Sequence, residues 1–214
     1  MPRRTHLVAL AAAFTLGASG SLAAPVSLLD TDLSLRTVAQ GTPTSEEFVT
    51  SFPASAVVSA EEVEFPDVAS LFDPTVGVPP GFANSLVDVA IDAGADFLTI
   101  DFDNSAPFFQ FATGFQNTYV FTFDDEVAPT ITGATIAEDV TTLGLDPSDV
   151  TFAGNELFVN VESLRFDVST FARIDLTAEV GPAPIPLPAA GAMLMSALAA
   201  AGGLSLRRRR RAFG

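Results

Sequence analysis

Apolar and polar residues alternate with a period of two along several segments of the chain. In segment 95–103, Leu98, Ile100 and Phe102 fall on one face, and the positions between them are polar. Such alternation is typical of a β-strand with one buried face. The same pattern recurs in 118–124, with Tyr119, Phe121 and Phe123 inward, and in 172–180, with Ala172, Ile174, Leu176, Ala178 and Val180 inward.

A β-hairpin is predicted where 150–153 and 156–159 flank Gly154-Asn155, because both turn residues tolerate positive φ. Further strands are expected near 34–40, 63–66, 86–92, 107–115 and 130–137, with short helical turns allowed in 44–50 and 136–145. About eight short strands separated by proline and glycine predict an all-β domain, an antiparallel β-sandwich of jelly-roll or immunoglobulin-like type. A barrel remains the alternative.

The N-terminus has the pattern of a secretory signal peptide. Arg3 and Arg4 precede an apolar stretch at 7–16, and small residues at Ser21 and Ala23 fit a cleavage site after Ala23. An uncleaved anchor is the alternative, although the apolar stretch is short for a membrane span. We therefore expect the export machinery to move the chain across the inner membrane and signal peptidase to cleave the signal peptide.

The C-terminus combines a proline motif, an apolar segment and a basic cluster. The segment 189–206 would form about 27 Å of helix, close to the roughly 30 Å hydrocarbon thickness of a bilayer. The basic cluster after it predicts a cytoplasmic C-terminal side and acts as a topological stop. The motif is Ile185, Pro186, Leu187, Pro188 and Ala189, and the cluster is Arg207, Arg208, Arg209, Arg210 and Arg211.

This layout resembles the PEP-CTERM class of sorting signals, in its VPLPA-CTERM variant. Ile185 stands where that variant usually has Val, and the Pro-Glu-Pro triplet of the parent class is missing. The resemblance covers residues 184–211. It implies that an exosortase-type membrane transpeptidase of a Gram-negative bacterium recognises Pro186, Leu187, Pro188 and Ala189 and transfers the body to the cell surface or exterior. A plain C-terminal tail anchor is the alternative.

These patterns divide the chain into five parts. Residues 1–23 are the expected signal peptide, 24–181 the β-sandwich domain, 182–188 the proline-rich linker with the sorting motif, 189–206 the transmembrane helix and 207–214 the arginine-rich tail.

The body contains all 26 acids and only Arg36, Arg165 and Arg173 as bases, a formal charge of −23. Such a surface repels nucleic acid and anionic lipid. Its 17 phenylalanines predict a folded body rather than a disordered one.

Composition also excludes much chemistry from the body. The only histidine is His6, in the expected signal peptide, and the chain has no cysteine and no lysine. Serine–histidine triads, thiol catalysis, Schiff bases and ordinary zinc sites are therefore excluded. Carboxylate-only hydrolysis survives, but sugar clefts favour aromatic platforms, and the body has no Trp and only Tyr119. We expect a non-enzymatic protein without an organic cofactor.

Calcium is the one metal that the sequence suggests. Hard oxygen donors cluster at two expected strand ends, where Ca²⁺ takes six to eight oxygen ligands. These donors are Asp101, Asp103 and Asn104 at one end, and Asp124 and Asp125 at the other. Two functions therefore follow from the sequence. The first is a structural or adhesive surface protein, in contact with exopolysaccharide, and the second is a calcium- or glycan-binding extracellular module.

Overall fold

The structure is a computed structural model that describes residues 27–107, 109–124 and 129–179. Its regular elements are twelve β-strands and one short 3₁₀ turn, η1 (Val68–Leu71). All strand pairs are antiparallel, so the all-β prediction is confirmed. Within these ranges, no helix is long and apolar enough to cross a membrane.

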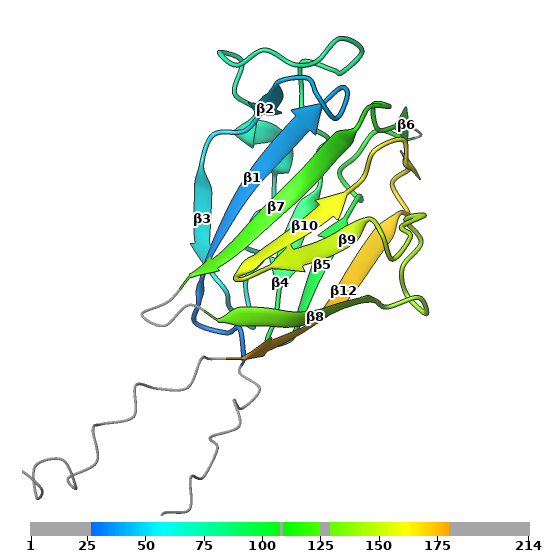
Figure 1. The fold of residues 1–214 in the computed structure, drawn as a ribbon. Coiled ribbons are helices and arrows are strands. Elements are labelled where there is room, and N and C mark those ends of the chain that lie inside the picture. The colour runs from blue at the N-terminus through cyan, green and yellow to red at the C-terminus, as the bar shows by residue number, and fades with distance from the viewer. Residues whose placement is uncertain (1–26, 108, 125–128, 180–214) are drawn as a thin grey trace, which may run out of the picture.

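The larger sheet, here called the front sheet, is built on β1 (Asp32–Gln40) and β7 (Gln116–Asp124), which pair along their whole length (Figure 1). Beyond β7 follow β10 (Glu156–Asn160) and β9 (Val150–Ala153). On the other side of β1, its two halves pair with β2 (Glu47–Val49) and β3 (Ala54–Val57). The hairpin predicted from Gly154-Asn155 is confirmed, and Gly154 has a φ of 63°.

The smaller sheet, here called the back sheet, has the order β4-β5-β12-β8. Its strands are β4 (Ala90–Ala93), β5 (Phe97–Asp101), β12 (Phe171–Glu179) and β8 (Thr130–Ile136). In Figure 1, β4, β5 and β12 lie behind the front sheet, and β8 runs along its lower edge. A separate two-stranded ribbon pairs β6 (Phe109–Gln110) with β11 (Arg165–Phe166).

The facing sides of the two sheets contribute to one hydrophobic core. Leu98, Ile100 and Phe102 are fully buried, which confirms the inward face predicted for that segment. The inward faces predicted for β7 and for residues 172–178 of β12 are confirmed as well, whereas Val180 lies outside the described residues. Both sheets supply members of a single cluster of packed buried side chains, among them Leu33, Leu35, Phe121, Phe123, Leu157, Ile91, Leu98, Ile100, Ile174 and Ile131.

Backbone contacts link the edges of the two sheets on both sides. On one side, the Ile131 N–H at the start of β8 donates to the carbonyl of Gly154 in the β9–β10 turn, at 2.7 Å. On the other side, Phe65 and Ile91 exchange two hydrogen bonds at 2.8 and 3.0 Å, so the segment after β3 covers the edge of β4. Covered edges leave fewer unpaired N–H and C=O groups for pairing with another chain.

Several predicted elements differ from the observed ones. The strand expected at 63–66 is only the Phe65 bridge, because that segment serves as an edge cover. The strand expected at 107–115 is reduced to the two residues of β6. Residues 44–50 contain β2 rather than a helical turn, since pairing with β1 determines their conformation. Residues 136–145 contain one helical turn, in which Thr141 N–H donates to the Ala137 carbonyl at 3.0 Å, and β3 was not predicted.

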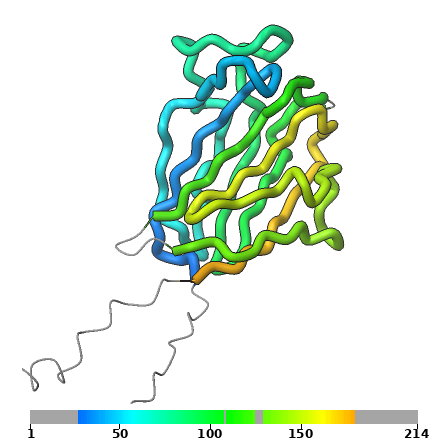
Figure 2. Tube along the Cα trace, in the orientation of Figure 1, coloured from blue at the N-terminus to red at the C-terminus, as the bar shows by residue number. Residues whose placement is uncertain are grey.

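Both ends of the described body lie at the same end of the two sheets, as the tube in Figure 2 shows. Leu28 N–H donates to the Ala95 carbonyl at 2.8 Å, and Leu176 N–H donates to the neighbouring Asp96 carbonyl at 2.7 Å. The segment just before β1 and Leu176 of β12 are thus both bonded to the β4–β5 turn.

Candidate binding cavity

A cavity of about 340 Å³ opens at the opposite end of the body, near the end of β1 and the start of β7. Inward side chains of these two strands form its floor: Thr37 and Ala39 from β1, and Asn117 and Tyr119 from β7. Its size lies in the range of small-molecule sites. Most of the remaining wall comes from the irregular segment 78–88, from Ala106 and residues 109–112, and from Thr50, Phe72 and Phe166.

The cavity forms because the inward residues of both strands become smaller towards this end. Along β1 the inward positions run Leu33, Leu35, Thr37 and Ala39, so two large apolar residues precede two small ones. The paired positions of β7 run from Phe123 through Phe121 and Tyr119 to Asn117. The loop that covers this end follows η1 and contains no regular element before β4, as the prolines and glycine of 76–82 predict.

Aromatic rings make up much of the wall. The lining rings Phe111, Phe166 and Tyr119 form a connected cluster with Phe102 of the core behind them, with ring centroids 4.8–6.4 Å apart and partly in edge-to-face geometry. Phe109 stacks on Phe166 with centroids 6.3 Å apart, yet 61% of its surface is exposed. An apolar ring left in solvent beside a cavity is available to a ligand.

Phe82, on the covering loop, completes the wall of the cavity. Its ring packs directly against the backbone at position 114, where only glycine leaves enough space. A Cβ on Gly114 would lie 2.7 Å from the Phe82 ring and 2.9 Å from the backbone oxygen of Gln40. Any side chain at position 114 therefore displaces either the ring or the end of β1. The Gly114 N–H also donates to Glu162 at 3.0 Å, which fixes this approach.

Polar groups of the cavity fall into two kinds. The hydroxyls of Thr37 and Thr50 bond to each other at 2.8 Å, so their hydrogen-bonding needs are met within the protein. Asp88 differs, because its Oδ1 is buried and takes no hydrogen bond within the described part of the chain. Desolvation by burial, and next the charge of Asp67, raise the pKa of this carboxyl above 3.8.

Tyr119 is the second polar residue of interest in the cavity. Only 4% of the residue is exposed, it lines the cavity, and burial raises the pKa of its hydroxyl. Sequence analysis had placed Tyr119 on the inward face but missed Asp88, a lone acid in the apolar run 86–91.

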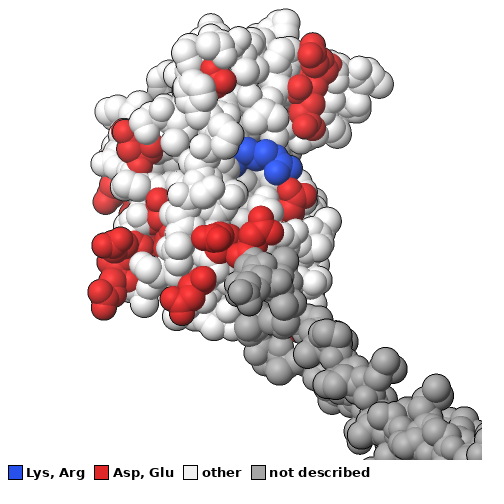
Figure 3. Space-filling view, turned by 90° about the vertical axis from the view of Figure 1, so that its left-hand side faces the viewer, with Lys and Arg blue, Asp and Glu red and all other residues white. Residues whose placement is uncertain are grey.

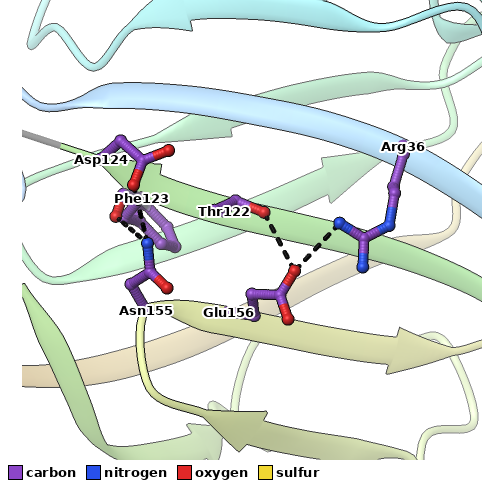
Figure 4. Close-up of polar contacts among 6 residues, drawn as sticks. All are labelled: Arg36, Thr122, Phe123, Asp124, Asn155 and Glu156. Atoms are coloured by element: carbon purple, nitrogen blue, oxygen red, sulfur yellow. Dashed lines mark hydrogen bonds and ion pairs between the residues drawn. The ribbon is translucent and has the colours of Figure 1, made fainter. Parts of the chain in front are cut away.

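The predicted calcium ligands lie elsewhere and do not converge. Asp101 ends β5 beside the start of β12, and its Oδ1 accepts a hydrogen bond from Asp103 N–H at 2.9 Å. Asp124 lies opposite Asp32, at the other end of the sheets, and accepts from Asn155 Nδ2 at 2.8 Å (Figure 4). Asn104 is exposed, and Asp125 lies outside the described residues. Within the described ranges, no three acidic, histidine or cysteine side chains are grouped to hold a metal ion.

The sorting motif Ile185–Ala189, the apolar segment 189–206 and Arg207–Arg211 also lie outside the described residues, as does the expected signal peptide. Of the arginines in the body, Arg36 pairs with Glu156 at 2.9 Å and Arg173 with Asp175 at 2.8 Å. Figure 3 shows acidic side chains spread over one face, with basic atoms gathered in one small place.

The chain matches no family model, no curated protein and no solved structure.

Proposed function

We propose that this chain is an exported surface or extracellular-matrix protein with a structural or adhesive role. In this proposal an exosortase-type transpeptidase recognises Pro186–Ala189 and removes the C-terminal segments, after the signal peptide has been cleaved. The protein is held in the inner membrane before that step and lies at the cell surface or outside the cell after it. The main support is the tripartite layout of 185–211.

The geometry of the body supports this arrangement. Ser27 and Glu179, the two ends of the described body, lie at the same end of the sheets. A body that passes from an N-terminal export signal to a C-terminal membrane segment meets the membrane twice from the same side. Having both ends together lets one end face the membrane, while the cavity at the other end points towards the medium.

The charge of the body suits the same location. Acids outnumber bases by 26 to three between Asp30 and Glu179, which disfavours nucleic acid and anionic lipid as partners. High net charge keeps an exported protein soluble, and salt screens its self-repulsion beyond about 10 Å. Exopolysaccharide is the surface partner that we propose. The role that we propose is non-enzymatic, because the body has no His, Cys or Lys and, with no Trp and one Tyr, few of the aromatic platforms of a carboxylate-based sugar hydrolase.

We propose further that the two sheets are the layers of a β-sandwich. A shared core between their facing sides supports this. The chain also crosses between the sheets from β7 to β8 and from β8 to β9, the kind of connection that jelly-roll and immunoglobulin-like sandwiches use.

The alternative, a calcium- or glycan-binding module, draws its support from the cavity more than from the acids. Asp101 and Asp124 belong to opposite ends of the sheets, so a calcium ion at either would need further oxygen donors. A ligand that binds only the folded protein raises its melting temperature. Melting in millimolar calcium and in EDTA tests this alternative, and equal melting temperatures would count against it.

Intact mass, measured on the protein from the envelope and from the medium of its native host, tests the sorting proposal. We expect a chain that starts near Ala24 and ends between Pro184 and Ala189, with or without an added group. A variant with Pro186→Ala and Pro188→Ala should keep its C-terminus, whereas Pro182→Ala in the linker is the matched control and should be processed normally. A native mass that retains Arg207–Arg211 would contradict the proposal and leave a tail-anchored protein.

A further inference from the structure

We infer that the cavity binds a small organic cation, a molecule with an apolar and preferably aromatic frame that carries one protonated amine. Asp88 is the partner of the amine, and the phenylalanine walls hold the frame. This binding function goes beyond the sorting proposal and does not depend on it, because all of its residues lie in the described body.

The apolar frame follows from the walls. Twelve of the twenty lining residues are Ala, Val, Leu or Phe, and the phenylalanines come from four separate segments of the chain. Phenyl faces carry partial negative charge and attract cations as well as apolar groups. The exposed ring of Phe109 lies at the mouth, where a ligand would cover it.

The hydrogen-bond donor follows from Asp88, the one acid that lines the cavity. An ionised carboxyl accepts hydrogen bonds but donates none, so a ligand beside the Asp88 side chain gains most if it donates. The buried Oδ1 of the same carboxyl takes no hydrogen bond within the described residues, so the protein itself does not neutralise the group. Tyr119 offers a second polar contact on the β7 side of the cavity. By contrast, Thr37 and Thr50 satisfy each other and need no ligand.

The positive charge follows from the electrostatics. The lining contains one acid and no Lys, Arg or His, and the surrounding body carries a formal charge of −23. A carboxylate or phosphate ligand would be repelled by both. An ammonium group gains a charge-assisted hydrogen bond to Asp88, which is stronger than a neutral one. A neutral sugar could use the polar lining residues, but it gains no charge-assisted hydrogen bond to Asp88.

Three matched probes test the inference: phenethylamine, 2-phenylethanol and phenylacetate, which differ in charge but share a phenyl ring. Protein expressed from the full 214-residue sequence is titrated with each by calorimetry at neutral pH. We expect phenethylamine to bind about tenfold more tightly than the alcohol, the difference between a charged and a neutral hydrogen bond. Phenylacetate should bind most weakly.

Variants show whether Asp88 and the cavity are responsible. Asp88→Asn should reduce phenethylamine binding to the level of the alcohol, whereas Asp139→Asn, the same charge change at an exposed position outside the cavity, should leave the tenfold ratio intact. Ala39→Leu fills the floor and should weaken both probes, and its melting temperature shows whether it folds. Tyr119→Phe keeps the ring and should lower affinity for both probes without changing their ratio.

Equal binding of amine and alcohol, or an equal loss in the Asp88 and Asp139 variants, would overturn the inference. Tighter binding of a neutral oligosaccharide than of phenethylamine would also overturn it and assign the cavity to glycans. Failure of sorting in the mass experiment would leave the titration result unaffected, so the two proposals fail separately.

Discussion

The two halves of the space between the sheets are built from the same strands but packed differently. In the half near the chain ends, Leu33 and Leu35 of β1 meet Phe121 and Phe123 of β7, and all four are at most 1% exposed. In the other half, the same strands present small or polar side chains and enclose a cavity. Backbone pairing continues without interruption from one half to the other, so the side chains alone make the difference.

The filled half therefore supplies most of the stability of the fold, and the open half leaves space in which a ligand can bind. Protein interiors are normally packed without large voids, because empty space forfeits dispersion contacts. An unfilled half in which the buried Asp88 Oδ1 has no hydrogen-bond partner therefore costs stability. Substitutions placed in each half should separate these two roles.

The largest effect is expected from Phe121→Ala in the filled half. Its ring is fully buried between the sheets, and truncation leaves a cavity, which costs about 3–5 kcal/mol of unfolding free energy. The same change at Phe109, on the rim of the open half, should cost less than about 1 kcal/mol because that ring is 61% exposed. Urea unfolding of both variants measures the difference, and similar losses would refute the division into halves.

A smaller loss is expected from Gly114→Ala in the open half. The new methyl would collide with the Phe82 ring and with the Gln40 carbonyl, so the covering loop must shift at a cost of about 1–3 kcal/mol. Gly144→Ala is the matched control, because a Cβ there meets nothing within 4 Å. Thermal melting compares the two, and an unchanged melting temperature for Gly114→Ala would show that Phe82 moves freely.

Sequence patterns predicted the filled half better than the open one. Alternation at Leu98–Phe102 and at Tyr119–Phe123 identified the inward faces, because a buried face imposes its period on the residues that form it. The cavity instead depends on which loop covers the small residues Thr37 and Ala39, and that contact joins segments far apart in sequence. Periodicity carries no information about such contacts, so Asp88 was missed.

Asp88→Asn should raise stability slightly at neutral pH, by well under about 1 kcal/mol, because it removes a charge with one buried oxygen and its repulsion from Asp67, while solvent around this partly exposed side chain screens most of the effect. Since the pKa of Asp88 is raised in the folded protein, the folded state binds the proton more tightly than the unfolded state. The wild type therefore regains this stability as the pH falls through the raised pKa towards 3.8, and the gap between the two proteins closes. Urea unfolding at neutral pH and near pH 4 checks both statements, with Asp67→Asn as the test of the second charge.

The smallest effect is expected from Arg36→Ala, on the outer face of the front sheet and outside both halves. Arg36 lies across β7 from Glu156, which also accepts a hydrogen bond from Thr122 at 3.4 Å (Figure 4). The Arg36 and Glu156 side chains are 40% and 30% exposed, so solvent screens the ion pair and its loss should cost about 0–1 kcal/mol. A double-mutant cycle with Glu156→Gln, at low and high salt, isolates the coupling between them. A coupling above 2 kcal/mol that salt leaves unchanged would mean that the outer face supports the fold as strongly as the filled half, and the contrast between the halves would then no longer explain where stability resides.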